Sequence, residues 1–239
     1  MTAETLFPLV PWVVLIPLAG ILINLLAGRA LGERGVGLVA SLAALGSFAV
    51  SVLLAVGLAQ QPEGQSLLLA RWMSIGSLNV DWAFRVDTLS VTMMLVVSGV
   101  GTLIHIYSIG YMHDDTRHNG DPARFRRFFL YLNLFIAAMM VLVSADNYLM
   151  MFVGWEGVGL CSYLLIGFWF EKGEAGLGNA RAAKKAFVVN RIGDLGFLIA
   201  MFTMFWAFGS LSFGEVLPRA AEAAPAVLLA ITLFFLLAV

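Results

Sequence analysis

The chain has 239 residues, of which 61% are hydrophobic and only 12% are charged. A soluble domain usually carries about 25% charged residues, so this composition excludes an ordinary water-soluble protein. The formal net charge is −1, which leaves no basic surface for a nucleic acid and predicts no nucleic acid partner.

Six long stretches contain no charged residue, and a seventh contains only one. Such runs match the roughly 20 apolar residues that a helix needs to cross a bilayer. They cover residues 5–28, 35–62, 88–113, 128–145, 195–214 and 223–239, and residues 147–170 hold only Glu156. We therefore predict an all-α polytopic membrane protein with six complete transmembrane helices and the start of a seventh. The helices are expected near 8–27, 36–58, 88–110, 123–145, 147–170, 182–208 and 225–239.

Helix starts and one short pair of strands can be predicted from local residue patterns. Asp121 and Pro122 form an N-cap followed by a helix-starting proline, and Pro225 opens the last helix in the same way. Residues 79–87 alternate between apolar and polar side chains, which is typical of a half-buried strand. We expect them to form an extramembrane β-hairpin within residues 63–87, between helices 2 and 3.

Cofactor and metal motifs are absent from the sequence. The single cysteine, Cys161, allows neither an intrachain disulfide nor a cysteine-ligated iron–sulfur cluster. No dinucleotide-binding or phosphate-loop pattern occurs. The group His113, Asp114, Asp115 and His118 lies in an arginine-containing loop and is interpreted as solvated rather than metal-binding. No cofactor and no metal are therefore expected in this chain.

The two ends of the chain also carry information. The amino end is acidic and lacks the basic region of a cleaved signal peptide, so the first helix is expected to remain. The sequence stops at Val239 within an apolar run without a polar flank. We therefore expect the natural polypeptide to continue.

Basic residues are distributed unevenly over the expected loops. Ten lie in odd-numbered loops or at the start of the following helix, against three on the other side, with Arg191 inside a helix. Because basic loops stay on the cytoplasmic side, the amino terminus is predicted on the non-cytoplasmic side.

Three ionisable side chains are expected at membrane depth. Glu156 lies ~13 Å into the fifth helix and Asp194 roughly 18 Å into the sixth, at 1.5 Å per residue. Arg191 lies one turn before Asp194. A charge near the bilayer centre costs on the order of 2.5–3.5 kcal/mol, so each one needs a partner, a wet cavity or a function.

Each of these residues has a structural and a functional interpretation. Arg191 and Asp194 can simply offset each other as an i,i+3 pair. Alternatively, Lys184, Arg191 and Asp194 share one face of the helix, as a hydrated half-channel would require. Glu156 has no neutralising partner in its own helix, which favours a functional role. His105 is a secondary candidate for which a structural role is preferred.

Several long motifs resemble one family. Residues 154–168 (GWEGVGLCSYLLIGF) closely resemble the fifth helix of the largest antiporter-like subunit of respiratory complex I, NADH–quinone oxidoreductase. The likeness extends to four further motifs, FRVD at 84–87, HIYSIGYM at 105–112, FFLYLNLF at 128–135 and NRIGD at 190–194. It therefore covers the third to sixth expected helices in register.

The resemblance implies a fold and a function. Family members contain inverted repeats of transmembrane helices, so residues 1–239 would be the amino-terminal part of one antiporter-like domain. Glu156 would be the glutamate that pairs with a buried lysine in helix 7, beyond this chain, and Asp194 and Arg191 would lie near the same proton channel. NADH, flavin (FMN), iron–sulfur clusters and quinone would belong to partner subunits.

The resulting hypothesis is a proton-translocating membrane subunit of complex I, and thus part of an oxidoreductase and translocase without redox chemistry of its own. Its partners would be other membrane subunits, protons and the lipid of an energy-coupling membrane, either the bacterial plasma membrane or the inner mitochondrial membrane. The alternatives are a subunit of a stand-alone multi-subunit sodium/proton antiporter and a purely structural anchor.

Overall fold

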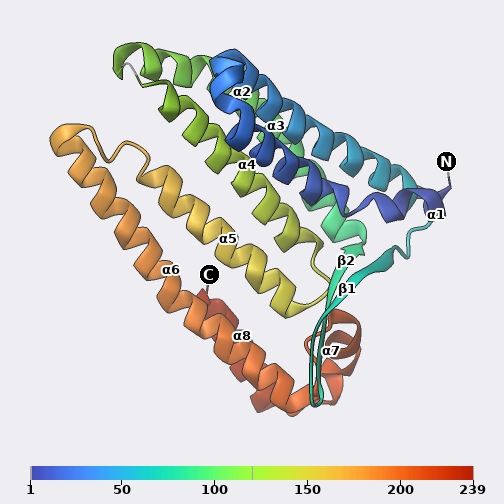
Figure 1. Ribbon diagram of the computed structural model, residues 1–239. Helices are drawn as coiled ribbons and strands as arrows, with labels where there is room; N and C mark the ends of the chain where they lie inside the picture. The colour runs from blue at the N-terminus through green and yellow to red at the C-terminus, as the bar shows by residue number, and fades with distance from the viewer. Residues whose placement is uncertain (1, 120, 239) are drawn as a thin grey trace. The chain divides into compact units, whose positions relative to one another are not determined.

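The computed structural model describes residues 2–119 and 121–238, without the side chains of residues 116–119. The described chain is mostly helical and divides into two compact units (Figure 1). Unit 1 contains residues 1–67 and 85–144, and unit 2 contains residues 68–84 and 145–239.

Unit 1 consists of α1 (Ala3–Leu6), a short 3-10 turn, α2 (Trp12–Gln60), α3 (Thr88–Asn119) and α4 (Pro122–Ser144). The three long helices pack on one another. Their core contains fully buried Phe125, Phe129, Met94 and Leu54. Asp121 caps α4 as predicted, since its Oδ1 accepts a hydrogen bond from the Ala123 backbone N–H at 2.9 Å.

Helix α2 contains both of the first two expected spans. Its only non-helical residue is Gly32, with φ 65° and ψ −178°, a conformation that is essentially restricted to glycine. The chain reverses there, because Gly20 lies against Ala43 and Gly28 lies against Val36. The two segments therefore form an antiparallel helical hairpin.

The predicted count of six complete helices and the start of a seventh differs from the structure, because the first two expected spans are the two segments of one helical element, α2. Five helices among the described residues are long and apolar enough to cross a membrane, and α8 is a shorter apolar helix. Arg29 and Arg34 separate two charge-free stretches and suggested a loop, whereas a single glycine is sufficient to turn the chain. The mostly helical membrane fold is confirmed.

The hairpin predicted within residues 63–87 is confirmed. It consists of β1 (Gln65–Ile75) and β2 (Leu78–Val86), which pair in one two-stranded sheet. A two-residue turn joins them, and Gly76 has the positive φ of 61° that tight hairpin turns require.

Unit 2 contains α5 (Tyr148–Ile166), α6 (Gly173–Phe208), α7 (Phe213–Arg219), a 3-10 turn and α8 (Pro225–Ala238). Its core is formed by apolar residues of α6, α7 and α8 and the segment between α6 and α7, among them Phe197, Met201, Met204 and Ile231. Helix α6 begins nine residues earlier than expected, with Glu174 in its first turn, where a negative charge favours helix formation.

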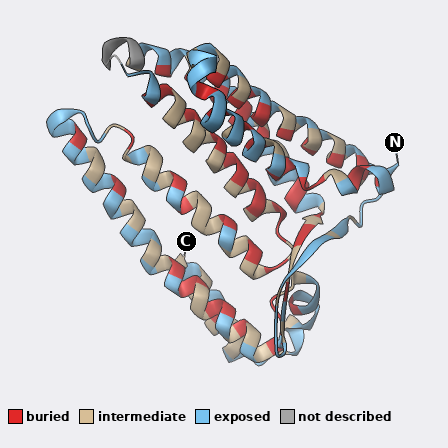
Figure 2. Cartoon of the chain, in the orientation of Figure 1, coloured by how far each residue is buried: buried red, intermediate tan, exposed pale blue. Residues whose placement is uncertain are grey.

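Each spanning helix carries both buried and exposed residues (Figure 2). Many of the exposed residues are large and apolar, such as Leu26, Leu103, Phe202 and Trp206. This pattern is typical of helices with one face packed on neighbours and another face in lipid.

Candidate functional site in helices α5 and α6

The start of α5 is fixed by Asn147. Its side-chain oxygen accepts a hydrogen bond from the Met150 N–H, and its Nδ2 donates to the Asp81 carbonyl of β2, both at 2.8 Å. Asn147 therefore ties the first turn of α5 to the hairpin. Glu156 follows two and a half turns later on this anchored helix.

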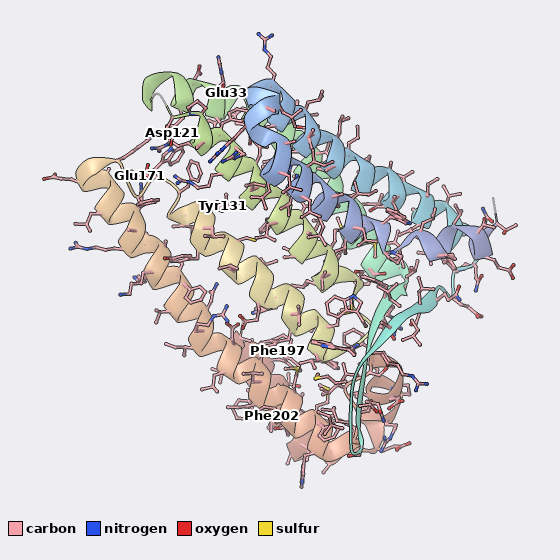
Figure 3. All side chains as sticks on the ribbon, viewed as in Figure 1. Glu33, Asp121, Tyr131, Glu171, Phe197 and Phe202 are labelled. Carbon is pink, nitrogen blue, oxygen red and sulfur yellow. The ribbon has the colours of Figure 1, made fainter. Side chains whose placement is uncertain are left out.

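Aromatic side chains hold α5 against α6, which runs beside it in Figure 1. The ring of Phe197 lies 5.1 Å from that of Phe152 and 5.8 Å from that of Trp155. Figure 3 shows Phe197 on the side of α6 that faces α5, whereas Phe202 points away. This packing sets the rotation of both helices and brings their charged residues together.

Arg191 bridges two carboxylates from different helices. Its guanidinium forms an ion pair with Glu156 of α5. Its Nε also lies 3.2 Å from Asp194 Oδ2, one turn along α6, without hydrogen-bond geometry. The side chain of Asp194 is only 6% exposed, whereas those of Glu156 and Arg191 are 27% and 35% exposed.

Two further side chains shape this cluster. Trp155 Nε1 donates a hydrogen bond to Asp194 Oδ1 at 2.8 Å. The Phe187 ring lies 4.6 Å from the Arg191 guanidinium carbon, a distance that allows a cation–π interaction. Gly159 of α5 lies beside the guanidinium, since a Cβ at this position would be in van der Waals contact, 3.4 Å from one of its nitrogens. Two negative charges and one positive charge therefore share a site that is partly shielded from solvent.

Comparisons with known proteins match most of the chain, including α5 and α6. The family model described as NADH-ubiquinone oxidoreductase (complex I), chain 5 N-terminus matches residues 72–129. The model described as NADH:quinone oxidoreductase/Mrp antiporter, transmembrane, matches residues 145–239, which include the whole cluster. The chain is 48% identical over 226 residues to NADH-quinone oxidoreductase subunit L of Mycobacterium tuberculosis. The chain belongs to the subunit L (chain 5) family of complex I.

A second relative in the subunit L family is NADH-ubiquinone oxidoreductase chain 5 of Allomyces macrogynus, with 40% identity over 228 residues. These two alignments cover 94% and 95% of this chain but 34% of each relative. The chain thus spans about a third of their length. The Mrp complex from Dietzia sp. has a similar fold, with a TM-score of 0.75 and 23% sequence identity over 96% of this chain and 23% of that chain.

Lys184, the third residue predicted on the polar face of α6, lies two turns before Arg191. It is exposed, and it forms no ion pair with any side chain that the structure describes. The structure therefore brings Glu156, Arg191 and Asp194 together but does not add Lys184 to the cluster.

His105 lies in unit 1 and is fully buried between α3 and α4. Its Nδ1 donates to the Gly101 carbonyl at 2.7 Å, and its Nε2 lies 2.9 Å from Asn133 Oδ1. Both ring nitrogens thus have partners, an arrangement that fits a structural role.

The prediction of a loop at residues 113–118 is wrong, because these residues belong to the last turns of α3. His113 Nδ1 lies 2.8 Å from Glu33 Oε2, and the side chain of His118 is outside the described residues. Among the described residues no group of three potential metal ligands occurs.

The sequence alone did not indicate two features of the site. Trp155 was not recognised as a partner of Asp194, although it directly precedes Glu156 in the resembling motif. The Glu156–Arg191 pair was also missed, because Arg191 was assigned only to its neighbour in the same helix.

Proposed function

We propose that this chain is part of a proton-translocating membrane subunit of NADH–quinone oxidoreductase, in which charged residues within the transmembrane helices couple redox energy released elsewhere to proton movement. The observation that carries the proposal is the bridge from Arg191 to Glu156 and Asp194. Membership of the subunit L family favours a role in complex I over a role in a stand-alone sodium/proton antiporter.

The bridge is suited to proton transfer because it has one cation for two carboxylates. Protonation of Glu156 would remove its attraction for Arg191, and the guanidinium would then be held by Asp194 alone. A proton bound at Glu156 thus changes which carboxylate neutralises the arginine. Arg191 would thus have two arrangements, one paired with both carboxylates and one paired with Asp194 alone. A mechanism that couples proton binding to a structural change requires two such states.

The energies involved are compatible with this role. Moving one charge against a gradient near 200 mV requires roughly 4–5 kcal/mol. An opposite charge in a desolvated site changes the proton affinity of its neighbour by about one to three pKa units, each worth about 1.4 kcal/mol. Gain and loss of an ion pair can therefore supply most of the required energy without a redox group in this chain.

NADH, FMN, the iron–sulfur clusters and quinone are assigned to partner subunits, and other membrane subunits of the complex are the expected contacts. The amino terminus is placed on the non-cytoplasmic side of the energy-coupling membrane, because the basic residues gather in the odd-numbered loops. Single cysteines at Ser77 and Glu174, in a Cys161→Ser background, should react with an impermeant thiol reagent from opposite sides. Reaction from the same side would overturn this topology.

Glu156→Gln tests the function, with Glu174→Gln at the exposed start of α6 as the matched control. NADH-driven proton uptake into vesicles, normalised to assembled complex, should fall strongly for Glu156→Gln, partly for Glu156→Asp, and not at all for Glu174→Gln. Normal pumping by Glu156→Gln would favour the structural anchor. Sodium/proton exchange by this subunit without NADH or redox partners would favour the stand-alone antiporter.

A further inference from the structure

The end of unit 1 at the α2 reversal contains two cavities. One has a volume of about 200 Å³ and lies between α2 and the start of α4, with Arg29, Glu33 and Arg126 as the charged residues of its lining. The second, of about 530 Å³, lies between the α2 reversal and the end of α3 and includes Arg34 in its lining. Figure 3 shows Glu33 and Asp121 at this end of the unit.

The arginine and histidine side chains around these cavities differ in whether they contact a carboxylate. His113 faces Glu33, and Arg124 Nε lies 3.4 Å from Asp115 Oδ2. Arg29, Arg34 and Arg126 form no ion pair with any side chain that the structure describes. Glu33 lines both cavities, so it can balance Arg34 in the wider one, whereas Arg29 and Arg126 leave the smaller cavity with one positive charge more than its lining carboxylate balances.

The shape of α2 positions one of these arginines. The aliphatic stem of Arg126 lies across Gly28, where a Cβ would approach Arg126 Cδ to 2.7 Å. The guanidinium is thereby carried from α4 towards the smaller cavity, where Arg29 of α2 also lies. Two guanidinium groups from two helices can bind a phosphate with several charge-assisted hydrogen bonds.

The lining is amphipathic as well as basic. Leu31, Ile109 and Phe125 line the wider cavity beside Arg34. Both cavities lie at the ends of apolar helices, where a membrane-spanning segment meets the headgroup layer. A free inorganic anion would make no favourable contact with the apolar part of this lining, whereas the glycerol and upper acyl region of a phospholipid would pack against it.

We propose that the cavities at the α2 reversal bind the phosphate headgroup of an anionic phospholipid, with Arg29 and Arg126 as its ligands. Arg34 adds positive charge at the rim. Basic pockets between transmembrane helices are a known setting for anionic lipid headgroups. The bound lipid would neutralise this end of unit 1 and link α2 to α4.

The test uses the assembled, purified complex and a photoactivatable phosphatidylglycerol, with the cross-linked peptides mapped by mass spectrometry. Labelling should occur in peptides containing residues 29–36 and 122–126. Excess phosphatidylglycerol should suppress it, whereas phosphatidylcholine and millimolar inorganic phosphate should not. Equal competition by inorganic phosphate would overturn the lipid assignment in favour of a free-anion site, and absence of labelling in these peptides would overturn the site itself.

Variants test the two ligands directly. The double variant Arg29→Gln/Arg126→Gln should lose at least about tenfold in labelling, because it removes both proposed ligands and even one charged hydrogen bond is worth about a factor of ten in affinity. Arg71→Gln on the exposed β1 strand is the matched control and should label normally. Undiminished labelling of the assembled double variant would contradict the proposal, and the competition experiment on the unsubstituted complex decides the matter if that variant fails to assemble.

Discussion

Trp155 Nε1 donates a hydrogen bond to Asp194 Oδ1 at 2.8 Å, while the adjacent Glu156 forms an ion pair with Arg191. Two consecutive residues of α5 thus bind the carboxylate of Asp194 and the guanidinium of Arg191 on α6. One turn of α5 thereby determines both the position of the Asp194 carboxylate and the partner of Arg191.

Trp155→Phe should keep most of the ring packing on Phe197 but remove the hydrogen bond to Asp194. We expect a loss of about 1.5–3 kcal/mol in stability, as for hydrogen bonds to charged groups, together with reduced proton pumping. Thermal unfolding of the assembled complex and proton uptake measure the two effects. Trp206→Phe is the control, since Trp206 is 79% exposed on α6, and an equal effect of both changes would contradict the assigned role.

Glu156 and Arg191 should be energetically coupled. Arg191→Gln leaves two carboxylates without their cation, and Glu156→Gln removes one of them, so the double variant should be less destabilised than the sum of the single changes. A coupling on the order of 1–3 kcal/mol is expected for contacting charges. A double-mutant cycle on the thermal stability of the complex measures this energy. If the effects of the two single changes simply add, the ion pair between Glu156 and Arg191 does not contribute to stability.

Asp87 should make the junction between β2 and α3 sensitive to acid. Burial raises the pKa of its carboxyl, but hydrogen bonds from the Ser90 N–H, the Arg85 side chain and the Ser90 hydroxyl outweigh burial, so the pKa lies below its ordinary value of 3.8. Because the pKa of Asp87 is lower in the folded protein than in the unfolded chain, its carboxylate stabilises the fold at a pH above the unfolded-state pKa. This stabilisation is lost as the pH falls through the folded-state pKa. The stability difference between the unsubstituted protein and Asp87→Asn should therefore shrink below about pH 4. A difference independent of pH in thermal unfolding would refute this.

Gly32→Ala should destabilise the protein because alanine is strained at the φ of 65° found there. A cost of roughly 1–3 kcal/mol is expected for such a backbone conformation. Gly110→Ala in α3 is a suitable control, since Gly110 has space for a Cβ, and it should be neutral or slightly stabilising. Comparison of the unfolding temperatures of the two variants checks the prediction.

Features that depend on local sequence were predictable. Pro122 and Pro225 begin helices as expected, because a proline at the first helical position loses no hydrogen bond. The alternation in residues 79–87 identified β2, because a strand with one buried face has a period of two. The sequence predicts a loop at the α2 reversal, because Arg29 and Arg34 interrupt the apolar residues there. The positive φ of Gly32, which turns the chain without a loop, cannot be predicted from the composition.

Contacts between helices were not predictable in the same way. The spacing of Arg191 and Asp194 indicates a contact within one helix. The contact with Glu156 depends on how α5 and α6 are rotated, which is set by the Phe152, Trp155 and Phe197 rings. A single sequence identifies which charges need partners but not which helix provides them.

The reversal at Gly32 also has a consequence for how the protein is made. The two segments of α2 are joined without an extended connection, and the contacts next to the turn, such as Gly28 with Val36, are close in sequence, a feature associated with rapid folding. During biosynthesis the second segment can dock on the first as soon as it emerges, so the pair can enter the bilayer as one unit. The orientation of the second segment is then fixed by that of the first and needs no separate signal.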